Sequence, residues 1–213
     1  MKFTFGRKQE VHPQPLVPSL CYIKNVITNP NIIVGDYTYY DDVNSNGEDF
    51  EKHVTHFYPH IGDKLIIGKF CSIAKGVEFV MNGANHPMDG ISAFPFGIFI
   101  ENKPTIPKEI VPDKGDTVIG NDVWIGQNAT FMPGVKVGDG AIIGTNAVVA
   151  KDIPSYSIAV GNPARVVKMR FDEKTIEKLL KIRWWDLPIE VIEENFGLLQ
   201  DKNIESFIAR FMN

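Results

Sequence analysis

The stretch that decides the fold runs from residue 119 to residue 153 and reads IGNDVWIGQNATFMPGVKVGDGAIIGTNAVVAKDI. An aliphatic or aromatic residue recurs there at every sixth position, namely Ile119, Ile125, Phe131, Val137, Ile143 and Val149. A second series of small or β-branched residues lies four positions after these, namely Val123, Ala129, Val135, Ala141, Ala147 and Ile153. A helix would space its apolar residues by three, four and seven, and a simple strand would alternate them, so the period indicates neither.

A period of six is typical of the hexapeptide repeats of a parallel β-helix. Each hexapeptide forms one short strand and one corner, and its first-series residue points inward and stacks on its counterparts in neighbouring coils. Such burial contributes roughly 1.5–3 kcal/mol per side chain. The small second-series residues leave room for the large ones. Glycine follows the first-series residue at Gly120, Gly126, Gly138 and Gly144, where a corner needs backbone freedom.

The same period appears earlier, at Ile67, Ile73 and Phe79, and Val34 with Gly35 begins a still earlier coil. Ile67 and Ile119 are 52 residues apart, which is not a multiple of six, so a segment between them leaves the register. We expect a loop ejected from the coils at about residues 85–115, and loops of that length are usually functional. A polar and then aromatic stretch at about residues 40–60 predicts a second excursion.

After residue 170 the apolar residues take helical spacing, and Pro188 restarts a second helix. The sequence therefore predicts a β-helix domain over residues 1–170, followed by C-terminal α-helices over residues 171–213. Because an uncovered end of a β-helix exposes apolar surface and backbone groups, we expect these helices to form a cap over the open end.

The composition excludes several classes of protein. Of 213 residues, 44% are hydrophobic and 23% charged, as is ordinary for a soluble globular protein. A net charge of -4 argues against a nucleic-acid partner. The chain has neither an apolar run long enough for a membrane span nor a secretory signal, and its two cysteines form no CxxC pair. We expect a cytoplasmic protein with reduced thiols.

Several motifs together carry a family resemblance: NGANHPMDG, GDTVIGNDVWIG, FMPGVKVGDGAIIG, and VGNPAR followed by WWD. They resemble the xenobiotic acetyltransferases, in particular the streptogramin A (virginiamycin) O-acetyltransferases, and type B chloramphenicol acetyltransferases share the frame. The resemblance extends from about Ile23 to about Gly197. It implies a left-handed parallel β-helix, a homotrimer with active sites between subunits, acetyl-CoA as co-substrate and no metal. The handedness follows from the resemblance and not from the spacing.

His86 is the candidate catalytic base, because it alone of the five histidines sits at the root of the long loop. A hydroxyl must lose its proton as it attacks a thioester, and a histidine with a pKa near 6.5 suits that step. In the family, the histidine of Asn-His does this work, which places Asn85 beside the acceptor. Asp89 could orient His86, bind an acceptor hydroxyl or cap a turn. Pro87 stands where streptogramin enzymes often carry arginine.

The resemblance also implies a binding track for coenzyme A. Gln127, Thr145 and Pro163 are spaced by 18 residues, one coil of three hexapeptides, and should lie in line along one corner. Lys151, Arg165 and Lys168 follow and match positions that meet the adenosine phosphates. Trp124 resembles a tryptophan at the thioester end. Tyr39 and Tyr58 match aromatic residues of the streptogramin acceptor site, where tyrosine offers flat apolar surface and a polar handle.

The sequence thus predicts direct acetyl transfer to the hydroxyl of a group A streptogramin within a ternary complex. His-Pro-x-Asp is similar to the galactoside and maltose acetyltransferases, so the same chemistry on a sugar or on chloramphenicol stays open. A γ-type carbonic anhydrase, with zinc on His53, His56 and His60, is a distant alternative, since these residues lie outside the regular coils. A non-catalytic trimeric β-helix is another.

Overall fold

A computed structural model describes residues 6–100 and 111–212 of the chain, in which short strands form three sheets. We call them sheets A, B and C. Sheet A contains β1 (Leu20–Tyr22), β3 (Tyr39–Asp41), β6 (Ser72–Ala74), β9 (Trp124–Ile125), β12 (Ile142–Ile143), β14 (Ser157–Val160) and β15 (Arg165–Met169). Sheet B contains β2 (Ile32–Val34), β5 (Leu65–Ile67), β8 (Thr117–Ile119) and β11 (Lys136–Val137). Sheet C contains β4 (Val54–Thr55), β7 (Glu78–Val80), β10 (Thr130–Phe131) and β13 (Val148–Val149).

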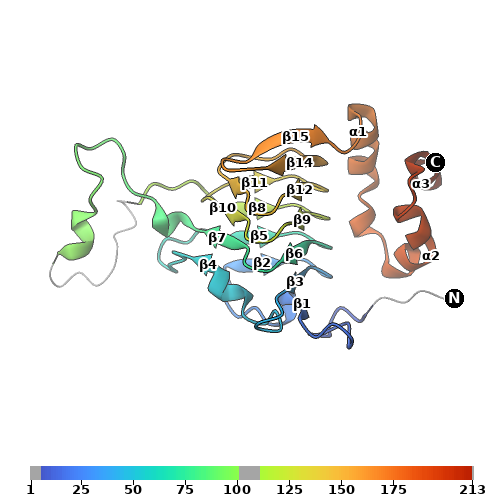
Figure 1. Cartoon of the computed structure of the whole chain (residues 1–213), viewed down its shortest axis with the longest axis horizontal. Coiled ribbons are helices and arrows are strands. Elements are labelled where there is room, and N and C mark those ends of the chain that lie inside the picture. The colour runs from blue at the N-terminus through green and yellow to red at the C-terminus, as the bar shows by residue number, and fades with distance from the viewer. Residues whose placement is uncertain (1–5, 101–110, 213) are drawn as a thin grey trace.

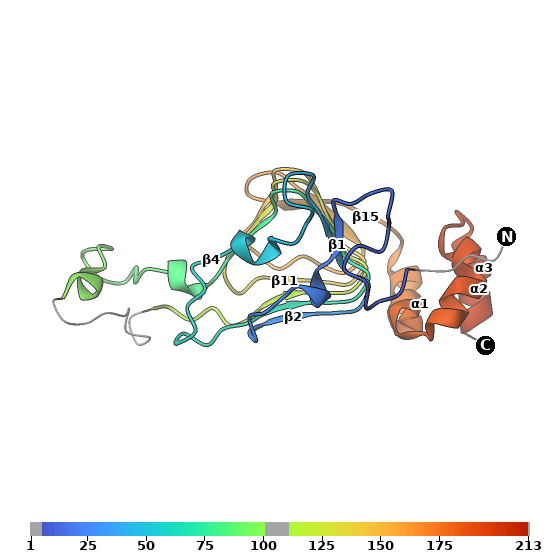
Figure 2. The ribbon, with the colours of Figure 1, turned by 90° about the horizontal axis from the view of Figure 1, so that it is seen from below.

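The chain visits sheets B, A and C in turn, so each coil adds one strand to every sheet. Strands of successive coils pair in parallel, with Ile125 beside Ile143, Phe131 beside Val149 and Ile67 beside Ile119. The strands stack in Figure 1, and the view along the stack in Figure 2 shows the three sides. The predicted parallel β-helix is confirmed. Antiparallel pairs occur at the two ends of sheet A, where β1 joins β3 and β15 folds back on β14.

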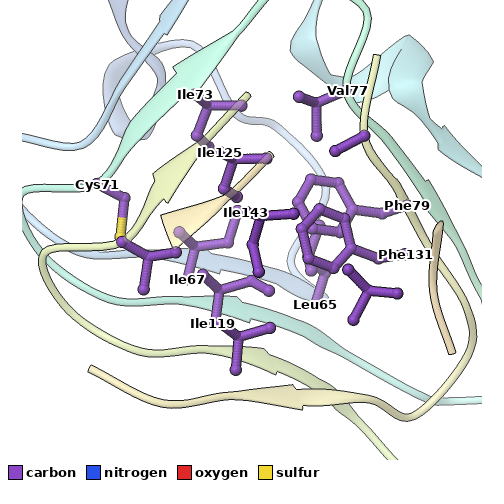
Figure 3. Packing of buried hydrophobic residues seen from close by; sticks show 14 of the residues in the cluster. Leu65, Ile67, Cys71, Ile73, Val77, Phe79, Ile119, Ile125, Phe131 and Ile143 are labelled. Carbon is purple, nitrogen blue, oxygen red and sulfur yellow. The ribbon is translucent and has the colours of Figure 1, made fainter. Parts of the chain in front are cut away.

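The core consists of the two apolar series, which point inward as predicted. All six first-series residues from Ile119 to Val149 are buried, and so are the second-series residues between them. The rings of Phe79 and Phe131 stack with centroids 4.8 Å apart, and isoleucines line up beside them (Figure 3). Both cysteines, Cys21 and Cys71, are buried and free.

A column of glycines lets the coils approach closely at the corner between sheets B and A. A Cβ added to Gly35 would lie 2.5 Å from the carbonyl carbon of Gly68, and one added to Gly68 would lie 2.5 Å from the carbonyl oxygen of Gly120. No real Cβ tolerates such contacts with backbone. The glycine that follows the first-series residue is therefore required here by the spacing of the coils rather than by turn conformation.

The chain leaves the coils after β7 and returns at β8. This segment contains the 3₁₀-helices η3 (Asn82–Ala84) and η4 (Phe96–Phe99), and Figure 1 shows it projecting away from the β-helix. Residues 101–110 of the expected excursion, with two of its prolines, lie outside the described residues. We call residues 82–100 and 111–116 the long loop.

The excursion expected at residues 40–60 is shorter than the composition suggests. β3 and β4 both fall within that range and belong to the coils, since β4 pairs in parallel with β7 and buries Val54. A single inward valine gives no repeat that spacing could reveal. Between the two strands lies η2 (Phe50–His53), and η1 (Ile23–Asn25) precedes β2.

The C-terminal helices lie beside the coils and not across their open end, contrary to expectation (Figure 2). They are α1 (Glu173–Ile182), α2 (Ile189–Leu199) and α3 (Ile204–Phe211), with η6 (Trp184–Asp186) between α1 and α2. Trp184 packs on Phe70 at 4.8 Å, and Asp186 pairs with Lys69 at 2.9 Å. These outward-pointing residues hold the helices at the corner between sheets B and A, where Phe70 offers them an apolar surface. No helix in the described ranges is both long and apolar enough to cross a membrane.

Candidate active site

A buried asparagine, Asn82, joins the two roots of the long loop. Its backbone N–H donates to Asp63 Oδ2 at 2.9 Å, which fixes it to the coil. Its Nδ2 donates to Asp113 Oδ1 and to the carbonyl of Gly115, both at 3.1 Å, on the returning root. Its Oδ1 accepts from the N–H of Lys114 at 3.0 Å. Because Asn82 is 0% exposed, these bonds are shielded from water and hold the roots together.

His86 follows four residues later and is exposed. Its Nδ1 lies 2.9 Å from the carbonyl oxygen of Ala93. A carbonyl can only accept, so Nδ1 carries the proton and Nε2 of the neutral ring keeps its lone pair. The imidazole lines a hollow of about 200 Å³ together with Phe94, Pro95 and Val111. A neutral histidine held in this tautomer can take a proton from a hydroxyl.

The polar neighbours of His86 do not orient it. The side-chain amide of Asn85 donates to Asn82 Oδ1 at 3.0 Å and to the carbonyl of Pro112 at 2.8 Å, so it closes the root of the loop. Asp89 is exposed, and it bonds to no residue within the ranges that the structure describes. The carbonyl of Ala93 has the orienting role that Asp89 could have taken.

Tyr58 lies beside the root of the loop that carries His86. A Cβ on Gly83 would meet the Tyr58 ring at 2.5 Å, so the ring lies flat against that glycine. The ring also stacks on His60 with centroids 5.9 Å apart. Tyr58 and His86 therefore approach the same corner, between sheets C and B.

Tyr39 and Trp124 lie elsewhere, in register on the outer face of sheet A. Tyr39 pairs with Ser72, and Ser72 pairs with Trp124. Two strand spacings therefore separate the two aromatic residues, roughly 10 Å. Trp124 is 57% exposed, although it is a large aromatic residue within a strand. An outward tryptophan is left available for a ligand or another chain.

The predicted coenzyme A residues divide between two corners. Gln127 and Thr145 are exposed at the corner between sheets A and C, where the N–H of Asn146 donates to the Gln127 carbonyl at 2.9 Å. Pro163 follows β14 at the same corner. Lys151 follows β13 and so lies at the next corner, between sheets C and B.

Arg165 and Lys168 are exposed on β15, at the edge of sheet A. Neither these two nor Lys151 pairs with an acidic side chain in residues 6–100 or 111–212.

Similar proteins place the chain in a family. Residues 116–151 match the family model described as bacterial transferase hexapeptide (six repeats). A protein of Lysinibacillus sphaericus named "Probable macrolide acetyltransferase" is 56% identical, over 81% of this chain and 95% of that protein. The chain belongs to the hexapeptide-repeat xenobiotic acetyltransferases. It is an acyltransferase, and the family and enzyme class predicted from the sequence are confirmed.

Other relatives of this acetyltransferase are named after different antibiotics. A virginiamycin A acetyltransferase of Staphylococcus aureus is 48% identical, over 91% of this chain and 90% of that protein. A chloramphenicol acetyltransferase of Escherichia coli is 43% identical, over 87% and 90% respectively. A solved hexapeptide-repeat acetyltransferase of Vibrio cholerae in complex with acetyl coenzyme A is 24% identical. It has a TM-score of 0.48 and covers 67% of this chain and 62% of that one.

The structure places two groups at the candidate site that sequence reasoning missed. Asn82 sits in the quoted motif NGANH, but nothing in its spacing shows that it holds both ends of a loop. The Ala93 carbonyl is a backbone group, so no residue type could point to it. Outside the loop, His53 Nε2 lies 3.0 Å from the Tyr40 hydroxyl, and His12 Nε2 lies 2.8 Å from Glu48 Oε1. Among the described residues no three His, Cys, Asp or Glu side chains group as metal ligands.

Proposed function

We propose that this acetyltransferase moves an acetyl group from acetyl-CoA to the hydroxyl of an antibiotic, a group A streptogramin in the first instance, with His86 as general base. The hydrogen bond from His86 Nδ1 to the Ala93 carbonyl carries the catalytic part of the proposal, because it leaves Nε2 unprotonated. The relative named virginiamycin A acetyltransferase supports the acceptor.

The reaction proceeds in one ternary complex. Nε2 of His86 takes the proton of the acceptor hydroxyl as its oxygen attacks the thioester carbonyl. The tetrahedral intermediate collapses, the carbon–sulfur bond breaks, and the thiolate of coenzyme A leaves with the proton from the imidazolium. General-base assistance of this kind is worth about 10²–10⁴-fold in rate. Asn85 and Asp89 lie at the acceptor side, and Asn85 acts by closing the loop root.

The donor binds along the corner between sheets A and C. The pantetheine arm follows Gln127, Thr145 and Pro163, with Trp124 at the thioester end. Arg165 and Lys168 meet the phosphates, since β15 begins at Arg165 beside that corner and carries Lys168 three residues further along the edge of sheet A. Lys151 stands one corner further on and reaches the phosphates only from another chain. No step uses a metal.

Completion of the site requires a homotrimer with active sites between subunits. Within one chain, His86 and Tyr58 approach the corner between sheets C and B, which is opposite the face of sheet A that carries Tyr39 and Trp124. Three exposed phenylalanines on the long loop, Phe94, Phe96 and Phe99, are 53%, 67% and 68% exposed. Burial of such side chains against a neighbouring subunit would stabilise the assembly. The loop of one subunit then brings His86 to sheet A of the next.

The other acceptors remain candidates for the same chemistry. The relative named for macrolides is 56% identical, and those named for chloramphenicol reach 43%. The sequence His86-Pro87 followed by Asp89 favours a sugar. Tyr39 and Tyr58 favour a large apolar acceptor with few polar groups. We place the enzyme in the cytoplasm, with residues 1–170 as the acyltransferase unit and residues 171–213 as a helical appendage.

The test is thiol release from acetyl-CoA with virginiamycin M1, a macrolide, chloramphenicol and a simple galactoside as separate acceptors. We expect turnover of virginiamycin M1 and a loss of at least about a hundredfold in kcat in His86→Ala. Met88→Ala, an exposed change two residues away on the same loop, should keep its activity and serves as the control. Preference for another acceptor overturns the streptogramin assignment alone. Full activity of His86→Ala, or a trapped acetyl-protein, overturns the mechanism.

A further inference from the structure

A second cavity lies between the coils and the C-terminal helices. These helices stand at the end of the molecule away from the long loop (Figure 2). The volume of the cavity is about 320 Å³. That is at the lower end of the range for small-molecule sites, roughly 300–1,000 Å³. Its walls are apolar side chains of all three helices, among them Leu179, Leu199 and Phe207. The acetyl transfer proposed above uses none of these residues.

The floor of the cavity is polar. Asp122 and Arg170 face each other there, with Oδ2 3.9 Å from the guanidinium nitrogen. Burial raises the pKa of Asp122 to about 6, with a smaller contribution from Asp139, against the lowering effects of Arg170 and Trp184. Even so, 32% of the Asp122 side chain remains accessible. Asp122 is one of the residues that line the cavity, so a ligand there can reach its carboxylate.

Tyr156 adds an unpartnered hydroxyl to this floor. The residue is 2% exposed, and its hydroxyl has no hydrogen-bond partner in the part of the chain that the structure describes. Its ring lies flat against Gly140, where a Cβ would come within 2.5 Å of it. The Arg170 guanidinium sits over the same ring, 5.4 Å from the centroid. Buried hydroxyls are usually partnered, so a ligand group at this position would satisfy Tyr156.

The charged side chains around the cavity indicate which charge a bound ligand would carry. Two carboxylates, those of Asp122 and the nearby Asp139, act on the floor against one cation, Arg170, while Asp201 and Lys202, which also line the cavity, add one charge of each sign. The Arg170 guanidinium already donates to the Gly140 carbonyl at 2.6 Å. The floor is therefore short of positive charge. Aromatic walls, among them Trp184 and Phe171, suit a cation as well, because the face of an aromatic ring attracts positive charge.

We propose that this cavity binds an amphipathic organic cation, an amine whose ammonium group sits at Asp122 and Tyr156 and whose apolar body lies against α2 and α3. The ammonium donates to the Asp122 carboxylate and to the Tyr156 hydroxyl oxygen. The apolar body replaces water against Leu199 and Phe207. This site is separate from the site of acetyl transfer, because the long loop leaves the coils at a different corner.

The experiment is calorimetric titration of the full chain at pH 7.5 with three matched probes: 4-phenylbutylamine, 4-phenylbutanol and 4-phenylbutyrate. We expect the amine to bind once per chain and at least about tenfold more tightly than the alcohol or the acid. Asp122→Asn should abolish that preference. His86→Ala should bind the amine like the wild type, and acetyl-CoA should not compete with it.

Two cavity-filling variants keep the test decisive. Leu199→Trp should weaken binding of all three probes, and Ile204→Phe on α3 should do the same if the first variant does not fold. Equal or tighter binding of the acid, or amine binding that survives Asp122→Asn, overturns the proposal. So does competition by acetyl-CoA, which would place the amine in the transfer site. None of these outcomes depends on the acceptor of the acetyl group.

Discussion

At the scale of single residues, the candidate site depends on two side chains with opposite degrees of exposure. His86 is exposed, and a single hydrogen bond from Nδ1 to the Ala93 carbonyl leaves Nε2 free for the proposed role as base. Asn82 is buried, and it bonds to Asp113 and Lys114 on the returning root of the loop and to Asn85 on the departing root. The bonds of Asn82 are shielded from water, so this side chain is suited to hold the loop that carries His86. We therefore expect Asn82 to act on catalysis by positioning His86.

Asn82→Ala should lower kcat at least about tenfold and destabilise the fold by about 2 kcal/mol, because it leaves several buried polar groups without partners. Thiol release and urea unfolding measure the two effects. The control is Asn121→Ala at the opposite corner, where Asn121 binds Asp139 Oδ1 and the N–H of Lys69, both at 2.8 Å. That variant should lose stability but keep kcat. If both variants lose kcat equally, Asn82 has no positioning role.

Asp122 predicts a pH dependence of stability. Its folded pKa of about 6 lies above the ordinary 3.8, so the folded state binds more protons between these values. Stability therefore falls as pH rises through that window, and the cost is fully present above it. Asp122→Asn should gain on the order of 1 kcal/mol over the wild type at pH 7.5, after allowance for solvent screening, and nothing near pH 4. Urea unfolding at both pH values checks this, and an equal gain at both would contradict it.

At the scale of elements, the coils are held together because equivalent residues of successive coils stack on one another. Strands of two or three residues could not persist alone, but each pairs with a strand of a neighbouring coil, and those in the middle of a sheet pair on both sides. Phe79 stacks on Phe131, and the corner glycines stack on one another, because equivalent positions of successive coils lie side by side. A change at one position is therefore felt by the neighbouring coils, since interiors of this density do not relax freely.

Gly68→Ala should destabilise the fold by several kcal/mol, on the order of the cost of overpacking a core, because its Cβ would meet the Gly120 carbonyl oxygen. The matched control is Gly197→Ala in α2, where an added Cβ meets nothing within 4 Å. That change should be neutral or stabilise by about 0.5–1 kcal/mol through helix propensity. Thermal unfolding of the two variants measures the contrast, and equal midpoints would show that the column tolerates side chains.

At the scale of the whole molecule, one chain carries two halves of a site that do not meet. The base projects on the long loop, and the residues expected to bind the donor lie on sheet A and its corner. This separation is a property of any triangular coil, since a corner and the side opposite to it face apart. Under the proposed mechanism the two halves meet only between subunits, and the exposed loop aromatics offer an apolar surface for such an assembly.

Mixed trimers test this arrangement. His86→Ala and Trp124→Ala should each be nearly inactive alone, because each removes one half of every site. Co-assembly of the two in equal amounts should restore roughly a quarter of the sites, in which both halves are intact. Thiol release on co-expressed, doubly tagged protein measures the recovery. Absence of any recovery in proven mixed trimers would place both residues in one chain's site.

The sequence by itself determined the repeat, because stacked coils need the same side-chain size every six residues and a repeat is visible without coordinates. It also pointed to His86, through its place at the root of a segment that breaks the register, and to the family through several motifs. The inward position of Val54 could not be predicted, because a single inward residue shows no period in the sequence. Asn82 escaped it because the sequence holds many asparagines and only burial distinguishes this one.

Only the tertiary structure decided how these parts meet. The helices after residue 170 were visible as helices, but their place beside the corner depends on outward groups such as Phe70 and Lys69, which are far away in the chain. The Ala93 carbonyl at His86 and the cavity at Asp122 have the same origin. Each depends on contacts between residues distant in sequence, and the period of a repeat records only contacts between equivalent positions.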